Sequence, residues 1–356
     1  MQYVKLGFIK IPYKITNKKN HKVLKIGFFS LPFDSFKTNE GQKYYRIFGV
    51  KLKLSFLSKL FVTRRQVNFQ KRNEWSDERI KKEAISIFKE KQGYVPDLEN
   101  PKSFNEKIFW MKLNYKNPLI TKCCDKYSVK DYVSEQIGSE FIVPTIASWE
   151  SADEIDFTNL PHKFVLKVNW SSGYNIIVED KTDINEEEIR NKIRKWMQPE
   201  RNSYYQSFNW GYKDMKPIVY AEEYIEHGDE QLFDYKFYCA NGKAVFLYIA
   251  TNRFNENAAF DFFDIDFNKL DLFYGGKKHS ETELKKPNFY DDMIRYAEIL
   301  SKPFPFVRVD FYEVGDRLYV GEMTFYSGGG ILKFEPIEWD YKLGEYFDLT
   351  SIIKGD

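Results

Sequence analysis

Two carboxylates face each other in a hairpin that the sequence predicts near residues 306–325. Its first strand holds Arg308 and Asp310, and its second holds Glu322 and Thr324. Side chains alternate between the faces of a strand, so each of these pairs shares one face. Matching the apolar faces around a three-residue turn at 315–317 sets Asp310 directly across from Glu322.

Like charges in that position repel each other and destabilise the sheet. A divalent cation between the two carboxylates would offset the repulsion, because magnesium binds one or two carboxylates together with substrate phosphates. A solvent-exposed polar face with a slightly different register explains the same residues without a metal. The hairpin alone leaves both interpretations open.

A lysine inside an apolar strand is the second chemical feature. Residues 164–168 form the predicted strand, and Lys167 is its one charged residue. A lysine in that setting needs an anionic partner. The strand opens into a small polar loop, Ser171-Ser172-Gly173, whose backbone N–H groups could cover phosphates. The loop is not a Walker P-loop, because no Gly-Lys-Ser/Thr opens a helix after it.

Two further segments place charged residues at the ends of predicted elements. A strand over 218–225 carries Glu222 and Glu223 near its end, where one could accept hydrogen bonds from a ribose or adenine while the other faces solvent. Asp125 is placed to cap a helix over 126–137. Lys126 then lies in the first turn, where a cation opposes the helix dipole unless an anion is nearby.

The elements that must position these residues follow from apolar spacing and turn residues. Helices are predicted from Asp77, from Asn105, and over 126–137, 185–197 and 289–300. Strands are predicted over 164–168, 174–178 and 218–225, and in two hairpins over 235–250, turning at Asn241-Gly242, and 306–325.

The first fifty residues contain a weak internal repeat at 3–8, 23–28 and 45–50, each an apolar–basic–apolar pattern around a glycine. Short strands suit this pattern. A small β-module for docking or glycan contact and a plain sheet extension both explain it. Residues 51–72 are dense in Lys and Arg interleaved with Leu and Phe. This composition is typical of helices that lie on anionic membranes and of linker helices packed on their own domain.

The composition excludes several classes. The 356 residues are enough for a sizeable core and two or three subdomains, and a net charge of +2 does not point to nucleic acid. Aromatic residues make up 18% of the chain, and either a thick aromatic core or rings that stack on sugars would explain this share. Three cysteines and four histidines show neither a disulfide framework nor zinc spacing. No signal peptide or membrane-length run is present, so we expect a cytoplasmic protein that can touch the inner face of the plasma membrane through residues 51–72.

Taken together and in this order, the segments resemble the ATP-grasp fold, and most of all its TupA-like branch, the amidoligases of bacterial surface-polysaccharide clusters. The resemblance covers roughly residues 104–349 and rests on five stretches: NPLITK at 117–122, DKYSVKDYV at 125–133, AEEY at 221–224, DYKF at 234–237 and FPFVRVDFY at 304–312. It implies an α+β fold in which two α+β subdomains sandwich ATP. We expect an N-terminal β-repeat module with a basic linker at 1–72, a helical region at 73–140 and the ATP-grasp core at 141–356.

The resemblance also implies roles for the candidate residues. The nucleotide-binding residues would be the phosphate-contacting lysines, the phosphate loop, the hinge glutamates and one further lysine: Lys126, Lys167, Ser171, Ser172, Gly173, Glu222, Glu223 and Lys236. Arg308, with Lys167, would act on the acyl-phosphate. Asp310 and Glu322 would bind magnesium. Most ATP-grasp enzymes carry Asn where this sequence has Thr324, and a hydroxyl is a poorer magnesium ligand than an amide oxygen.

The implied activity is an ATP- and Mg²⁺-dependent carboxylate–amine ligase that works through an acyl-phosphate. Its substrates would be a uronic acid or acidic substituent on a glycan or on a nucleotide- or lipid-linked sugar, and an amine, during capsule or O-antigen biosynthesis. No nucleic acid is expected as a partner. The alternatives are an ATP-grasp kinase of a sugar hydroxyl, a glycosyltransferase of the same pathway and a non-catalytic glycan-binding protein. The glycosyltransferase is disfavoured because Asp264-Ile265-Asp266 lies in an acidic, aromatic loop with no preceding strand expected.

Overall fold

The computed structural model describes residues 74–354 except 171, 227–231 and 252–257, together with Arg72 and the backbone of seven strands before it. It divides into two compact units, Met1–Trp75 and Ser76–Asp356. Within the described residues, no helix combines the length and the apolar character that crossing a membrane requires.

The first unit contains an antiparallel sheet of seven strands in the order β6-β5-β4-β3-β2-β1-β7. Its strands are β1 (Gln2–Leu6), β2 (Ile9–Lys18), β3 (His21–Ile26), β4 (Phe29–Lys37), β5 (Lys43–Ile47), β6 (Val50–Lys53) and β7 (Phe61–Val62). The repeats contribute β1, β3 and β5, and their glycines lie outside the described residues. Segment 51–72 was expected to be a linker or surface helix, but its described parts in β6 and β7 are strands. The alternation of apolar and basic residues at 50–53 has a period of two, which fits a strand better than a helix.

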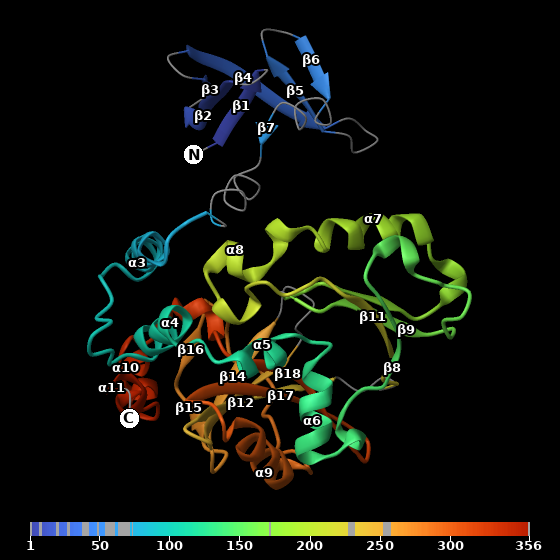
Figure 1. Cartoon of the computed structure of the whole chain (residues 1–356), viewed down its shortest axis with the longest axis vertical. Coiled ribbons are helices and arrows are strands. Elements are labelled where there is room, and N and C mark those ends of the chain that lie inside the picture. The colour runs from blue at the N-terminus through green and yellow to red at the C-terminus, as the bar shows by residue number, and fades with distance from the viewer. Residues whose placement is uncertain are drawn as a thin grey trace. The chain divides into compact units, whose positions relative to one another are not determined.

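The second unit is built on two main antiparallel sheets (Figure 1). The four-stranded sheet has the order β10-β9-β11-β8 and consists of β8 (Thr145–Trp149), β9 (Phe164–Val168), β10 (Asn175–Val178) and β11 (Val219–Glu223). The six-stranded sheet has the order β15-β14-β13-β12-β17-β18 and consists of β12 (Asp234–Ala240), β13 (Lys243–Thr251), β14 (Ala259–Asp264), β15 (Lys269–Leu270), β17 (Phe306–Val314) and β18 (Arg317–Thr324). A two-stranded sheet pairs β16 (Phe273–Tyr274) with β19 (Phe334–Glu335).

Helices cover these sheets. The longer ones are α3 (Asp77–Gln92), α4 (Phe104–Asn114), α6 (Val129–Ile137), α7 (Glu186–Trp196) and α9 (Tyr290–Ser301). The shorter ones are α5 (Pro118–Cys124), α8 (Ser203–Ser207), α10 (Glu338–Glu345) and α11 (Thr350–Lys354). Three short 3₁₀ turns matter below: η2 (Ala152–Glu154), η5 (Trp210–Tyr212) and η6 (Ser327–Gly330). Helix α9 buries Met293, Ala297 and Leu300, as its spacing predicts, and packs on β12, β13 and β17.

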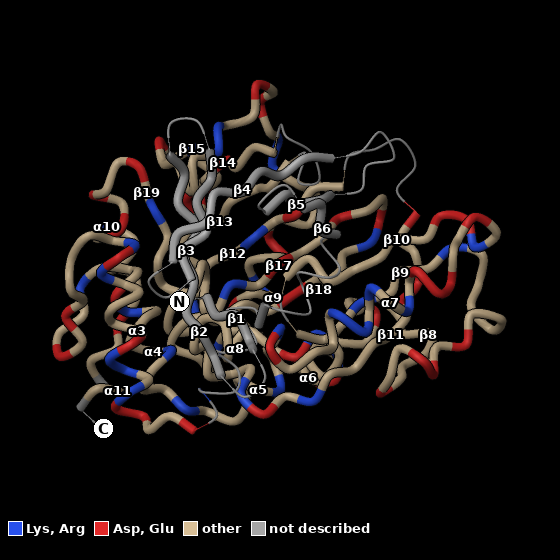
Figure 2. Tube along the Cα trace, turned by 90° about the horizontal axis from the view of Figure 1, so that it is seen from above, with Lys and Arg blue, Asp and Glu red and all other residues tan. Residues whose placement is uncertain are grey.

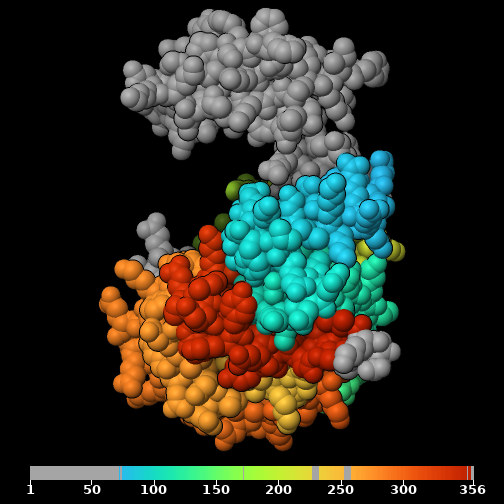
Figure 3. Space-filling view, turned by 90° about the vertical axis from the view of Figure 1, so that its left-hand side faces the viewer, coloured from blue at the N-terminus to red at the C-terminus, as the bar shows by residue number. Residues whose placement is uncertain are grey.

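Helix α4 is fixed to the C-terminal segment, and Figure 3 shows the two in contact at the surface. The side chain of Asn105 is fully buried, donates from Nδ2 to the carbonyl of Leu332 at 2.8 Å and accepts from the Leu332 N–H at 2.7 Å. The backbone N–H of Asn105 donates to Asp340 at 2.9 Å. These bonds hold residues 327–340 against α4, which positions the segment that follows β18.

Two expectations about local structure need correction. The helix predicted from 126 begins only at Val129, as α6. Asp125 ends α5, but its carboxylate accepts from the N–H groups of Tyr127 and Ser128, the hydrogen bonds expected of a capping residue. The dipole argument for Lys126 therefore does not apply. Asp264 ends a strand, β14, contrary to expectation. Its carboxylate accepts from the N–H groups of Asp266 and Asn268, so it closes a turn.

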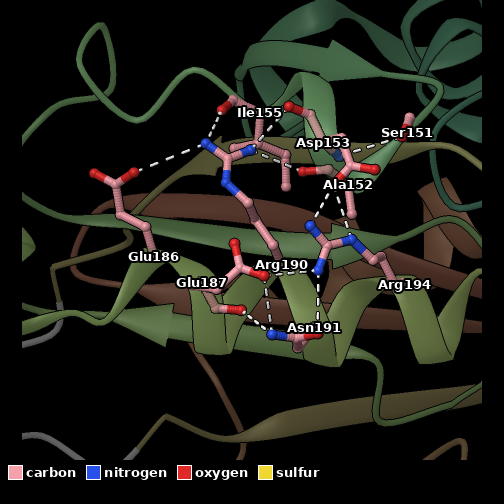
Figure 4. Close-up of polar contacts among 9 residues, drawn as sticks. All are labelled: Ser151, Ala152, Asp153, Ile155, Glu186, Glu187, Arg190, Asn191 and Arg194. Atoms are coloured by element: carbon pink, nitrogen blue, oxygen red, sulfur yellow. Dashed lines mark hydrogen bonds and ion pairs between the residues drawn. The ribbon is translucent and has the colours of Figure 1, made fainter.

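A polar network attaches α7 to the turn η2 (Figure 4). The Arg190 guanidinium donates to the carbonyls of Ala152, Asp153 and Ile155 at 2.8–3.1 Å and lies 5.0 Å from the centre of the Phe157 ring.

Arg190→Met should lower the free energy of unfolding by about 2 kcal/mol, because three carbonyls lose a charged donor. Chemical denaturation measures this.

Arg194 is the matched control for that variant, because its partners are the exposed carboxylates of Asp153 and Glu187. Exposed ion pairs contribute little. Arg194→Met should leave the melting temperature nearly unchanged. Equal losses in the two variants would show that the three carbonyl bonds do not fasten α7.

Candidate functional site

The predicted pairing of the two carboxylates is confirmed: Asp310 lies opposite Glu322, and Arg308 opposite Thr324. The route to this register differs from the prediction. Val314 pairs with Arg317, so the turn has two residues instead of three, and a bulge after Asp310 restores the register. The extra residue is Gly321, where an added Cβ would lie 2.3 Å from the Tyr312 ring.

Cations surround Asp310, which is 1% exposed. Lys236 faces it from β12, with Nζ 2.5 Å from Oδ2. Arg308 forms a two-pronged contact, Nε to Oδ1 at 2.6 Å and Nη2 to Oδ2 at 2.7 Å. Burial lowers the pKa of Arg308, but the charge and hydrogen bonds of Asp310, together with the neighbouring Tyr248 and Tyr238, outweigh burial and raise that pKa well above its usual value. The expected repulsion between Asp310 and Glu322 is therefore offset by cations of the chain itself.

Glu322 pairs with Lys126, whose Nζ lies 2.5 Å from Oε1. Burial alone would raise the pKa of Glu322, but the charges of Lys126 and Arg308 lower it to about 2. Glu322 is therefore ionised at neutral pH. Asp310 and Glu322 thus present two carboxylates, each bound to lysine or arginine, on one face of the hairpin.

Asn169 holds Lys126 in place, a role that was not predicted from the sequence. Its side chain is fully buried and donates to Asp125 at 2.7 Å and to the Lys216 carbonyl at 2.9 Å. The side-chain oxygen of Asn169 accepts from the Ile218 N–H. The backbone carbonyl of Asn169 accepts from the Lys126 N–H at 3.0 Å. One amide side chain thereby joins the end of β9, the start of β11 and the turn before α6.

A second cluster forms around Glu222, which is 4% exposed. Lys167 contacts its Oε2, and the Nζ of Lys130 lies 2.7 Å from its Oε1. The anionic partner that Lys167 requires is therefore Glu222. Lys130 was not among the candidate residues, although its position four residues after Lys126 was a usable signal. Glu223 is exposed and takes no part in the cluster.

Tyr220 connects the two clusters. It pairs with Lys167 across β11 and β9, and its hydroxyl donates to the Lys126 carbonyl at 3.3 Å. The Nζ of Lys130 lies 5.2 Å from the centre of its ring. The site thus contains five cations, Lys126, Lys130, Lys167, Lys236 and Arg308, and four carboxylates, Glu222, Asp234, Asp310 and Glu322. In Figure 2 charges of both signs are interspersed over the second unit.

The predicted phosphate loop joins β9 to β10. Ser171 lies outside the described residues, and Ser172 and Gly173 are exposed, with Gly173 at a φ of +76°. Both ends of the loop attach to Trp196 of α7: the indole of Trp170 donates to its carbonyl at 3.0 Å, and the ring of Tyr174 stacks on its ring at 5.1 Å. The loop therefore has fixed ends and an exposed tip.

Asp310 and Glu322 could hold a magnesium ion only if another group supplied further oxygen ligands. No cluster of three or more potential ligands among His, Cys, Asp and Glu occurs in the described part of the chain. Asp310 and Glu322 supply two hard oxygen donors, the number that magnesium uses when phosphates complete its shell. The Thr324 hydroxyl accepts from Arg308 at 3.0 Å, so it holds the arginine.

The Glu222 cluster makes stability depend on pH. Burial raises the pKa of Glu222, but Lys167 and Lys130 outweigh burial and lower it below the usual value. A lowered pKa stabilises the fold above the unfolded value of about 4.3, and this contribution fades as pH falls through the folded pKa. Glu222→Gln should therefore lower the melting temperature most at pH 7, with the difference shrinking below about pH 4. A pH-independent difference would contradict this assignment.

A family model matches most of the second unit. Residues 106–348, more than half of the chain, match the family described as TupA-like ATPgrasp. Similar solved structures include D-alanine–D-alanine ligase from Bacillus anthracis (17% identity, 57% of each chain covered, TM-score 0.32) and from Helicobacter pylori (12% identity, 64% of this chain and 61% of that chain, TM-score 0.33). Cdc123 from Schizosaccharomyces pombe is similar at 10% identity over 65% of this chain and 94% of that chain, with a TM-score of 0.35.

The chain spans less than two thirds of the length of these D-alanine ligases. No curated protein matches it. The family match covers the sheets of the second unit and the charged clusters described above. The α+β architecture of two sheet-based subdomains agrees with the ATP-grasp fold. The chain belongs to the TupA-like ATP-grasp family.

Proposed function

We propose that the protein is an ATP-dependent ligase that joins a carboxylate to an amine, with a uronic acid or acidic substituent of a surface polysaccharide as the carboxylate. The observation that carries this proposal is the set of three cations, Lys126, Lys236 and Arg308, around the facing carboxylates of Asp310 and Glu322, with Lys130 and Lys167 in the adjoining Glu222 cluster. Such an arrangement suits a highly charged phosphate substrate with a divalent cation, and the family match supports the same reading.

The chemistry needs no nucleophile from the protein. A substrate carboxylate oxygen attacks the γ-phosphorus of ATP, the bond to the β,γ-bridging oxygen breaks, and ADP leaves. An amine then attacks the acyl carbon, loses a proton and displaces inorganic phosphate. Lys126, Lys167 and Lys236 neutralise phosphate charge, and Arg308 faces the transferred group.

Asp310 and Glu322 would hold magnesium, which supplies charge neutralisation between the phosphates when bound. The lysines that now pair with these carboxylates, and with Glu222, are the groups that would turn to the phosphates. A structure of the B. anthracis D-alanine–D-alanine ligase contains ATP, and a structure of the ATP-grasp ligase PsnB contains both Mg and ADP. The membrane contact proposed for residues 51–72 and the docking role of the β-module stay predictions.

Nucleotide binding is the first measurable consequence. ATP with magnesium should raise the melting temperature, because it binds the folded state. Lys167→Ala should remove most of that shift, since it deletes a phosphate partner. The matched control is Lys163→Ala, an exposed lysine at the start of the same segment whose partner is Glu226. Equal ATP stabilisation of Lys167→Ala and the parent protein would rule out this role.

The reaction class is tested by isotope transfer. With a uronic acid labelled by ¹⁸O in its carboxyl group, one label should appear in the released phosphate, and hydroxylamine in place of the amine should give a hydroxamate. A kinase would form a stable sugar phosphate without label transfer, and a glycosyltransferase would not consume ATP. Unlabelled phosphate from a reaction that uses ATP and both substrates would exclude the acyl-phosphate.

A further inference from the structure

A cavity of about 430 Å³ lies outside the charged clusters, between α3, the end of α4 and the segment 203–213. This volume is within the range of small-molecule sites. We call it the lysine–aromatic pocket, after Lys81, Lys112, Lys116 and Lys213 and after Tyr204, Phe208 and Trp210, which line it. The proposed reaction of the chain does not by itself assign these residues a role.

The aromatic wall comes from one short segment that contains α8 and η5. Trp210 is half-buried, so part of its ring is accessible. Phe208 is 2% exposed and has a φ of +61°, a conformation that non-glycine residues rarely adopt. Phe208 is the left-handed residue that ends α8, and its N–H donates to the Tyr204 carbonyl at 2.8 Å. Accessible aromatic rings provide an apolar face with which the C–H groups of a sugar can make contact.

The charged wall favours an anion. Four lysines against two carboxylates, Asp77 and Glu78, leave a net charge of +2. Asp77 pairs with Lys116 at 3.0 Å, which neutralises one lysine. Lys81 and Lys213 are exposed, and neither forms an ion pair within the described residues. A carboxylate bound between them would therefore gain two cations without breaking an existing pair.

The pocket is connected to the catalytic hairpin. The Nζ of Lys112 donates to the Gly329 carbonyl at 2.6 Å, and Gly329 belongs to η6, which follows β18 directly. On the other wall, the N–H of Gly211 donates to the Tyr326 hydroxyl at 3.0 Å. Gly211 leaves no room for a side chain, because an added Cβ would lie 2.8 Å from the Sγ of Cys124. Both walls thus contact the segment that leaves the carboxylate pair.

We propose that the lysine–aromatic pocket binds a sugar unit that carries a carboxylate, with the ring against Trp210 and the charge between Lys81 and Lys213. This inference rests on the proposed function, since it assigns to this pocket a further acidic sugar unit of the glycan, apart from the carboxylate that reacts at the charged clusters. The expected ligand is a hexuronic acid unit, and a neutral sugar of the same size should bind more weakly.

The test uses the full-length protein with D-glucuronate, without ATP, and D-glucose as the neutral comparison. Saturation-transfer NMR and titration should show glucuronate binding at least tenfold tighter than glucose. Lys81→Ala combined with Lys213→Ala should weaken glucuronate binding at least tenfold, and Trp210→Ala should abolish saturation of the ring protons. The matched control is Lys82→Ala combined with Lys195→Ala, two exposed lysines on α3 and α7 outside the pocket, which should bind as the parent does.

Absence of glucuronate binding, equal binding of glucose, or equal loss in the control pair would overturn the pocket assignment. The ATP-induced melting shift of the Lys81/Lys213 variant should equal that of the parent, which shows that its nucleotide site is intact. The two proposals fail separately. If glucuronate binds in a lysine-dependent way but no ¹⁸O is transferred, the ligase proposal is wrong and the pocket proposal stands. If the pocket variant transfers ¹⁸O as efficiently as the parent, the pocket proposal is wrong and the ligase proposal stands.

Discussion

Asp310→Asn should lower turnover by about 10²–10³-fold and also lower the stability of the protein. Asp310 is 1% exposed and binds both Lys236 and Arg308. Neutralising it leaves Lys236 paired with Asp234 and removes the carboxylate that binds Arg308. Removing one partner of a buried ion pair costs about 3 kcal/mol or more. Steady-state ADP release and chemical denaturation measure the two effects.

This expectation reverses what the sequence alone implies. Two facing carboxylates repel, so replacing either one should stabilise the protein. The structure shows that Asp310 has buried cationic partners, and these dominate the balance. Glu322→Gln should lower turnover similarly and stability less, because Lys126 is about one fifth exposed and can be solvated. Asp316→Asn, in the exposed turn of the same hairpin, is the control and should change neither. A more stable Asp310→Asn protein would show that repulsion prevails.

The regular elements of the second unit followed from local patterns. The strand at 164–168 matches the prediction residue for residue, and β17 and β18 form the hairpin predicted over 306–325, because these are short, mainly apolar runs between clear turn signals. Asn241 and Gly242 form the predicted hairpin turn, both at positive φ. Residues 259–264 were missed, since the three aromatic and two acidic residues of this short strand offered no clean alternation.

The types of residue in the site were predictable from the sequence, whereas the ion-pair partner of each charged residue was less so. Lys167 needed an anion, but its partner Glu222 is 55 positions away, and only the pairing of β9 with β11 brings them together. Lys130 reaches the same carboxylate from α6. The Asp310–Glu322 register came out correctly although the turn was wrong, because the apolar faces fix the alternation whether the extra residue lies in the turn or in a bulge.

Arg308→Lys should reduce turnover by about 10²–10³-fold while leaving the ATP-induced melting shift near its parental size. The guanidinium binds both oxygens of Asp310 through Nε and Nη2, and the same Nη2 reaches the Thr324 hydroxyl at 3.0 Å. A lysine keeps the charge but cannot present two parallel N–H groups in a plane. The variant therefore preserves the charge of the site and removes the fixed direction that the proposed mechanism requires of that charge.

Measuring hydroxamate formation and the melting shift on the same protein separates the two contributions. Arg317→Lys is the matched control, because Arg317 lies on the same hairpin, is exposed, and donates to the Tyr319 hydroxyl at 3.3 Å. Its hydroxamate yield should equal that of the parent. Parental turnover in Arg308→Lys would mean that a point charge suffices at this position. Loss of the ATP shift together with turnover would instead place Arg308 in nucleotide binding, because orientation of the acyl-phosphate affects only the chemical step.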